Sequence, residues 1–188
     1  MARWDPGAED RLRQAAMDLF LERGFEAVTA TDIAVRAGLT RRTFFRHFTD
    51  KREVLFAGSD QLVDAVGDAV HAVDATRSPI DTVLQALSSV GGALAELSER
   101  ASDRRTIIAA SPELQERERT KMAAVTAALT AALRQRGIDG STAHLLGQVG
   151  AAVFATAFGR WVDSAGQADF AEFFQQAIAE LRSAMTDG

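Results

Sequence analysis

The sequence predicts an all-α protein, and three observations support this prediction. The 188-residue chain contains 36 alanines, the best helix former, and only three prolines. Apolar residues recur at helical spacing along most of the chain. No segment alternates apolar and polar residues for long enough to form a strand. We therefore expect about nine helices, arranged as a small N-terminal three-helix domain and a larger helical domain.

The first two predicted helices have clear ends. Residues 9–22 carry apolar side chains at spacings of three and four, and Gly24 ends this helix. Thr29 lies three residues before Asp32, which is the spacing of a capping box. These signals predict a second helix over residues 30–37.

A turn and a third short helix follow. Gly38 readily takes the left-handed conformation that lets the next helix leave at a steep angle. Thr40 can cap a helix over residues 41–47, in which Phe44 and Phe48 lie on one inward face. Two short helices joined in this way form a helix-turn-helix, whose second helix enters the major groove of DNA.

Six further helices are predicted beyond this motif, of which the one over residues 102–110 is short. Asp50 and Glu53 repeat the capping-box spacing at the start of the first of them. Ser78 and Pro79 have the residue types of an N-cap and a first helical position. Gly166 separates the last two helices. The expected ranges are 50–75, 78–94, 102–110, 111–136, 141–164 and 168–185.

The charge of the chain is uneven. The net charge is −5, but residues 36–52 carry six cations and one anion, whereas residues 57–188 carry 11 cations and 17 anions. An acidic protein with one basic segment suits selective docking onto a polyanion. Chance clustering on a solvated helix face is the alternative interpretation. The cations of the segment are Arg36, Arg41, Arg42, Arg46, Lys51 and Arg52.

The composition also limits the compartment and the chemistry. Cysteine is absent, which excludes disulfides and thiolate sites and suits a reducing cytosol. The N-terminus lacks the apolar run of a signal peptide, and the longest apolar stretch, residues 151–158, is too short to span a bilayer. We therefore expect a cytoplasmic protein with no membrane partner.

The third predicted helix has residue types that suit DNA recognition. Arg41 and Arg42 occupy its first turn, where side chains reach base edges, and a guanidinium can bond O6 and N7 of guanine together. Backbone N–H groups at the starts of the second and third helices can face phosphates. Double-stranded DNA is therefore the expected partner.

Several of these residues resemble a known family. The stretches 24–29 (GFEAVT), 32–40 (DIAVRAGLT) and 43–48 (TFFRHF), with Lys51, look like the N-terminal DNA-binding domain of TetR/AcrR-type transcriptional regulators. The resemblance closely covers residues 9–56. With the residue types above, it gives the expected DNA-binding residues: Thr29, Thr40, Arg41, Arg42, Thr43, Phe45, Arg46, His47 and Lys51.

Two positions depart from the pattern of the family. Its members usually have Tyr where Phe45 stands, and the phenol binds a phosphate, so this contact is lost here. A small residue is common where Arg42 stands. The additional cation can contact a base or a phosphate, or it can point into solvent.

The remainder of the chain resembles the family in layout. The resemblance implies a DNA-binding domain at residues 1–53 and a ligand-binding and dimerisation domain at residues 54–188. It implies a ligand-responsive regulator, in particular a repressor, that binds a pseudo-palindromic operator as a homodimer and is released by a small effector. The last two helices are expected to join the dimer through Gly147, Ala151, Ala155, Phe170, Phe174, Ile178 and Leu181.

The residues available to line a ligand pocket are apolar, which favours a small apolar effector. Segments near residues 106–114 and 160–161 are similar to a subgroup with acyl-CoA-like ligand domains, which points to an acyl-CoA with its nucleotide near Arg104 and Arg105. A solvated pair of arginines on a short helix is the alternative interpretation of these two residues. Packing in the core or at the dimer interface is the competing interpretation. The expected ligand-binding residues are Leu87, Val90, Met122, Val125, Phe154, Phe158 and Trp161.

No catalytic motif is present. The chain lacks a GxxxxGK phosphate loop, a GxGxxG after a strand, an HExxH helix and a GxSxG elbow. His71 and His144 have no carboxylate at ligand spacing, so we expect no metal site and no cofactor. The alternative functions are a helical enzyme with a dispersed site and a protein-interaction module without sequence-specific DNA binding.

Overall fold

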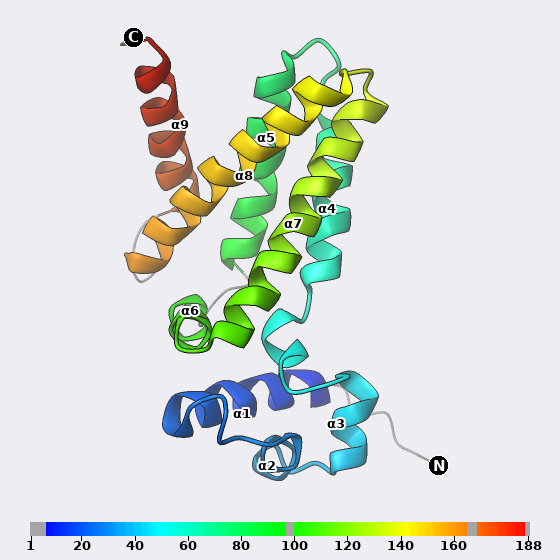
Figure 1. Cartoon of the computed structure of the whole chain (residues 1–188), viewed down its shortest axis with the longest axis vertical. Coiled ribbons are helices and arrows are strands. Elements are labelled where there is room, and N and C mark those ends of the chain that lie inside the picture. The colour runs from blue at the N-terminus through cyan, green and yellow to red at the C-terminus, as the bar shows by residue number, and fades with distance from the viewer. Residues whose placement is uncertain (1–6, 97–99, 165–168, 187–188) are drawn as a thin grey trace. The chain divides into compact units, whose positions relative to one another are not determined.

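The computed structural model describes residues 7–96, 100–164 and 169–186. Within these ranges every regular element is helical, as the sequence predicts (Figure 1). The elements are α1 (Ala8–Arg23), α2 (Ala30–Arg36), α3 (Arg41–His47), the 3₁₀-helix η1 (Glu53–Phe56), α4 (Ser59–Ala72), α5 (Pro79–Glu96), α6 (Ala101–Ala109), α7 (Pro112–Gln135), α8 (Gly140–Asp163) and α9 (Phe170–Thr186).

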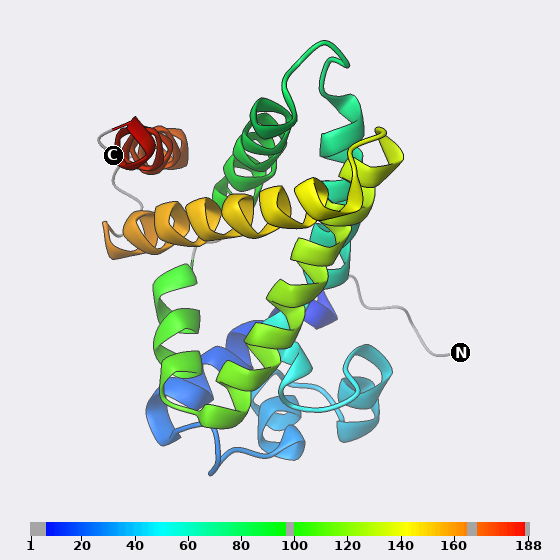
Figure 2. The same cartoon turned by 45° about the horizontal axis from the view of Figure 1, so that its top comes forward.

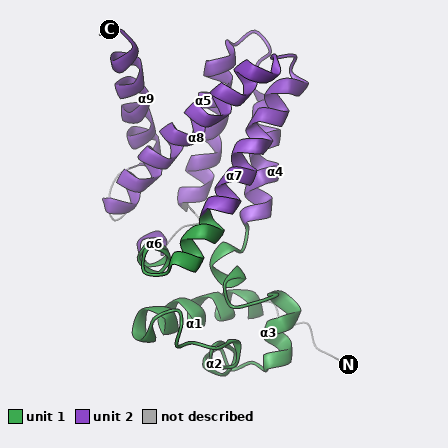
Figure 3. Cartoon of the chain, in the orientation of Figure 1, with its two compact units in different colours: residues 1–58, 103–118 green, residues 59–102, 119–188 purple. Residues whose placement is uncertain are grey.

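The chain forms two compact units (Figure 3). Unit 1 comprises residues 1–58 and 103–118, and unit 2 comprises residues 59–102 and 119–188. These units are geometric groupings, so the functional boundary between residues 53 and 54 stays a prediction. Residues 103–118 belong to unit 1 because Ile107, Ile108 and Leu114 are buried in the same apolar cluster as the residues of α1–α3.

The predicted caps of the short helices in unit 1 are confirmed. Thr29 Oγ1 accepts from the Asp32 N–H at 3.2 Å, and Asp32 Oδ2 accepts from the Thr29 N–H at 2.8 Å, which is the reciprocal capping box. Hydrogen bonds from the Thr29 side chain and backbone lower the pKa of Asp32. Thr40 Oγ1 accepts from the Thr43 N–H at 3.1 Å and so begins α3. Gly38 has φ of +68°, so the turn between α2 and α3 needs a residue without a Cβ.

The prediction of one long helix over residues 50–75 is wrong. The chain forms the 3₁₀-helix η1, turns at Gly58, whose φ is +87°, and begins α4 only at Ser59. The capping-box signal was real but local, because Asp50 Oδ1 accepts from the N–H groups of Arg52 and Glu53. Burial of Val54, Leu55 and Phe56 in the core of unit 1 favours the tighter helix, since all three side chains then reach the same cluster.

Charged contacts attach residues 103–118 to the segment around η1. Arg52 bonds Glu113 at 2.8 Å, and Arg117 bonds Glu53 at 2.6 Å. Arg104 donates to the Leu55 carbonyl at 2.8 Å. All three arginines and their partners belong to unit 1. Their charges therefore stabilise the packing of this unit and do not form part of a free basic surface.

Unit 2 is built around α5, α8 and α9. Here α4 packs beside α5, and α8 crosses α5 before the chain returns in α9 (Figures 1 and 2). Two glycines permit the close approach of these helices. A Cβ at Gly150 would lie 2.4 Å from Val83, and a Cβ at Gly91 would lie 2.1 Å from the ring of Phe170. An aromatic cluster fills the space between α8 and α9: Phe154, Phe158, Trp161, Phe170 and Phe174.

The helix α8 is long and apolar, and it contains the one candidate membrane span among the described residues. By length and composition it could cross a bilayer, which the sequence analysis missed because it considered only uninterrupted apolar runs. Only 28% of its most apolar 18-residue stretch is buried.

The α9 helix begins at Phe170, and both Gly166 and the predicted start at residue 168 lie outside the described residues.

Candidate nucleic-acid interface

The α3 helix presents three exposed arginines. Arg41, Arg42 and Arg46 lie on one seven-residue helix, and none of them forms an ion pair with an acidic residue in the part of the chain that the structure describes. Phe44 is fully buried and fixes the opposite face of the helix in the core. The helix therefore holds three available positive charges on a rigid element, which suits phosphate contacts and base readout.

The other cations of the basic segment are already engaged. Arg36 makes a bidentate pair with Glu22, with distances of 2.9 and 2.7 Å. This pairing lowers the pKa of Glu22, chiefly through the hydrogen bond from Arg36. Arg52 pairs with Asp50 at 2.6 Å. The sequence count of six cations thus overstates the charge that is free to meet DNA.

Lys51 has a structural role in this conformation. Its ammonium donates to the carbonyl oxygens of Phe25 at 2.7 Å and Val28 at 3.0 Å, and it lies 4.1 Å from the centroid of the Phe25 ring. These contacts fix the connection between α1 and α2. A phosphate contact through Lys51 stays a prediction.

His47 lies mostly inside unit 1. Its Nε2 is buried without a hydrogen-bond partner, and its Nδ1 lies 3.9 Å from Glu9 Oε2. The side chain is 17% exposed. A direct hydrogen bond from His47 to a phosphate would therefore require the side chain to rotate, and this contact also stays a prediction.

The three threonines of the predicted interface use their hydroxyls locally. Thr29 and Thr40 are helix caps, and Thr43 Oγ1 lies 3.0 Å from Thr40 Oγ1. The N–H groups of Thr29 and Thr43 are engaged in the same caps, so a DNA strand would meet the other backbone N–H groups at the starts of α2 and α3. Such groups are ordinary phosphate contacts.

The predicted ligand-binding residues do not gather around one cavity. Leu87, Val90 and Trp161 are buried in the core of unit 2, and Val125, Phe154 and Phe158 pack against that core. The rings of Phe154 and Phe158 stack with their centroids 5.9 Å apart. These described side chains pack against one another, so a ligand that entered between them would have to displace them.

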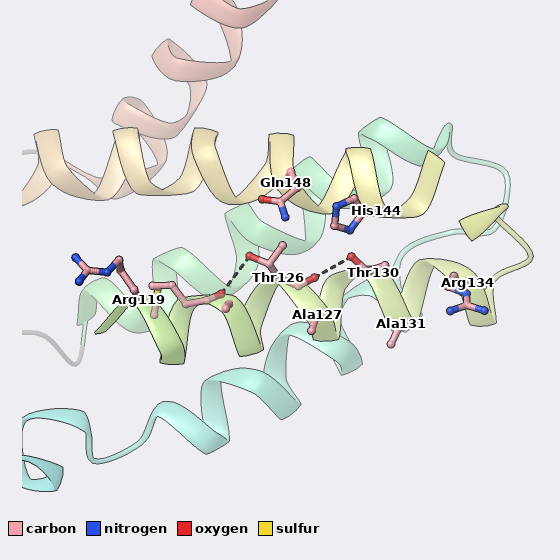
Figure 4. Close-up of a pocket in the computed structure, with 10 residues that line it drawn as sticks. Arg119, Thr126, Ala127, Thr130, Ala131, Arg134, His144 and Gln148 are labelled. Atoms are coloured by element: carbon pink, nitrogen blue, oxygen red, sulfur yellow. Dashed lines mark hydrogen bonds between the residues drawn. The ribbon is translucent and has the colours of Figure 1, made fainter. Parts of the chain in front are cut away.

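An open groove lies elsewhere in unit 2, between α7 and α8, with a volume of about 530 Å³. Met122 is the one predicted ligand residue that lines it. Figure 4 shows His144 and Gln148 of α8 above Thr126 and Thr130 of α7. The sequence analysis missed this groove, although the four-residue spacing of both polar pairs on exposed helix faces was a usable signal. The remaining lining residues are Arg119, Ala123, Ala127, Ala131 and Arg134.

Arg104, the suggested nucleotide contact, is engaged within unit 1 in this conformation, so its contact with a nucleotide stays a prediction. Besides bonding the Leu55 carbonyl, Arg104 bonds Glu118 at 3.0 Å and lies 5.2 Å from the centroid of the Phe56 ring. Its guanidinium is thus occupied within unit 1. Arg105 also has a partner in the structure.

Most of the predicted dimer residues are buried inside the single chain. Phe170, Phe174 and Ile178 are at most 6% exposed, and a Cβ at Gly147 would lie 2.7 Å from Thr130. These four residues hold the helices of one chain together, so a second copy could reach them only after repacking. The accessible members of the predicted set are Ala151, Ala155 and Leu181.

Comparison with known proteins decides the family. Residues 12–57 match the family model "Bacterial regulatory proteins, tetR family", and residues 77–186 match the model "MftR C-terminal domain". The chain belongs to the TetR family. It is a transcriptional regulator with a DNA-binding domain, not an enzyme, and α2 and α3 are the helix-turn-helix of this family.

Curated relatives of this TetR-family regulator match it over the N-terminal part. TcmR of Streptomyces glaucescens, a transcriptional regulator, is 34% identical over 83 residues, which cover 44% of this chain and 37% of TcmR. The transcriptional repressor Rv3405c of Mycobacterium tuberculosis is 37% identical over 82 residues, which cover 44% of this chain and 42% of the repressor. The chain thus spans about two fifths of the length of the curated relatives it matches.

A solved structure matches over both units. The TetR-family repressor FadR of Thermus thermophilus, in complex with lauroyl-CoA, is 27% identical. The match covers 91% of each chain, with a TM-score of 0.51. The likeness extends the family assignment from the helix-turn-helix to the C-terminal helices.

Proposed function

We propose that this TetR-family regulator is a cytoplasmic homodimeric repressor that binds a pseudo-palindromic operator through α3 and is released by a small apolar effector. The observation that supports DNA reading by α3 is the set of three exposed, unpaired arginines on a helix anchored by Phe44. Helix-turn-helix dimers bind two half-sites separated by whole turns of DNA. Repression agrees with the roles of Rv3405c and FadR, which are both transcriptional repressors.

Sequence selection from random duplexes tests this proposal. We expect the wild-type protein to enrich a site with two related half-sites. Arg46→Gln should weaken binding to every duplex alike and lower the salt slope by about one unit, because Arg46 stands beyond the first turn and meets phosphate. Arg77→Gln, an exposed arginine in the loop after α4, is the matched control and should leave both quantities unchanged. No enrichment by the wild-type protein would contradict the proposal.

The proposed effector is an acyl-CoA or another ligand with a large apolar part. FadR binds lauroyl-CoA, and the C-terminal helices here offer an apolar aromatic interior. Burying a hydrophilic ligand there would require a partner for each polar group. Because these side chains now fill the interior, binding must select a repacked conformation, and a hundredfold preference for that conformation corresponds to about 2.7 kcal/mol of coupling.

Release of the operator in the presence of candidate ligands tests the effector. We expect dodecanoyl-CoA to release the selected duplex and to change Trp161 fluorescence, because the indole lies 5.4 Å from the Phe158 ring in the cluster that must repack. Free coenzyme A should have a much smaller effect. Release by polar metabolites alone would exclude the apolar effector while leaving the DNA-binding proposal intact.

A further inference from the structure

The ring of Phe45 joins an exposed arginine to the core of unit 1. Phe45 meets the fully buried Phe44 edge to face, with ring centroids 5.3 Å apart and an interplanar angle of 80°. The Arg41 guanidinium carbon lies 5.2 Å from the centroid of the same Phe45 ring. The two residues are four apart on α3, so the helix itself brings them together.

This arrangement distinguishes Arg41 from the other two arginines of α3. An arginine over an aromatic face gains a cation–π attraction and loses part of its rotamer freedom before any ligand arrives. Arg42 and Arg46 contact no ring and form no ion pair within the described residues. Bidentate bonding to a base edge demands a defined orientation of the guanidinium, whereas a phosphate accepts a cation from many directions.

Exposure of the Phe45 ring also needs an explanation. Phe45 is 45% exposed, and its ring has no hydroxyl with which to bind a phosphate. Packing against Phe44 leaves this part of the residue open to solvent. Support of the Arg41 side chain would give the exposed part of Phe45 a function.

We propose that Phe45 is a positioning residue that holds the guanidinium of Arg41 ready for a base pair with two major-groove acceptors, such as guanine O6 and N7. Arg41 then reads sequence, and Arg42 and Arg46 bind phosphates. The inference rests on the proposed function, because it concerns how the same helix selects its operator.

Base preference measured one position at a time tests this inference. The selected operator and versions with each base pair replaced are titrated with the wild type and with Arg41→Ala, Arg42→Ala, Phe45→Leu and Phe45→Tyr. Arg41→Ala should abolish the guanine preference at one position of each half-site. Phe45→Leu should lower the same preference about twofold to fivefold, which is the size of an exposed cation–π contact. Phe45→Tyr keeps a π face and should retain the preference.

Three further readouts separate positioning from general packing. Phe45→Leu should leave the salt slope unchanged, and a thermal melt confirms that it folds. Val35→Ala, on an exposed apolar residue of α2 with no ring contact, is the matched control and should leave the preference intact. Equal loss of affinity for all sequences with Phe45→Leu, or loss of the guanine preference with Arg42→Ala instead of Arg41→Ala, would overturn the inference alone. A wild-type protein without base preference would overturn the proposed function as well.

Discussion

Replacement of Ala155 by arginine should convert the protein to monomers and lower operator affinity by about 10²- to 10⁴-fold. Ala155 is exposed on α8, so the new side chain can be accommodated in the single chain. The loss is large because a monomer must bind each half-site in a separate event, without the effective concentration that a dimer provides. Sedimentation velocity measures the oligomeric state, and titration of the selected duplex measures affinity.

The reason to choose α8 is its exposed apolar surface. The most apolar 18-residue stretch of α8 is only 28% buried, and Leu145 is 62% exposed. Exposed apolar surface on a soluble protein often marks an interaction site, so a second copy is the expected cover. Burial of Ala155 in that contact would leave no space for a charged arginine side chain and no partner for its charge.

The matched control is Ala75→Arg, which places the same charge at an exposed alanine after α4. It should remain dimeric and bind the operator as the wild type does. A dimeric Ala155→Arg protein would show that the interface avoids this face of α8. If a monomeric Ala155→Arg variant bound the operator with full affinity, dimerisation would not be needed for operator binding.

Local signals of the sequence were sufficient for much of unit 1. The Thr29–Asp32 capping box, the Thr40 cap and the Gly38 turn are each made by residues within four positions of one another, and all three form as expected. The family motif depends on this local geometry. For that reason the sequence located the recognition helix correctly.

Features that depend on distant partners could not be predicted in this way. Arg36 is engaged by Glu22, which lies 14 residues away. Arg52 pairs locally with Asp50, but it also bonds Glu113, which lies 61 residues away. Asp50 and Glu53 predicted a long helix, but burial of the three following apolar residues in unit 1 favoured a 3₁₀ turn. Local spacing contains no information about such tertiary contacts.

The apolar face of the last helix shows the same limit. Periodicity correctly predicted that Phe170, Phe174 and Ile178 share one face of a helix, but it did not reveal what covers that face. In the structure α5 and α8 of the same chain cover it. Core and interface residues have the same composition and spacing, so a stability measurement must distinguish them.

Replacement of Phe174 by alanine should therefore lower the free energy of unfolding by about 3–5 kcal/mol, the usual cost of removing a buried phenylalanine. Phe174 is 0% exposed, and its ring centroid lies 5.7 Å from that of Phe170 and 6.5 Å from that of Phe154. The lost ring leaves a cavity between three helices that cannot close without moving the aromatic cluster. Urea denaturation at one fixed protein concentration measures the change.

Met185→Ala is the matched control on the same helix. Met185 is 76% exposed, so its truncation should change the free energy of unfolding by less than about 0.5 kcal/mol. If Phe174 instead lay at a dimer interface, Phe174→Ala would weaken dimerisation in sedimentation velocity while the isolated chain kept its stability. The core assignment instead predicts a lower free energy of unfolding at the fixed concentration and an unchanged dimer dissociation constant. This combination would place Phe174 in the core of a single chain, because only there does the ring stabilise folding without contributing to association.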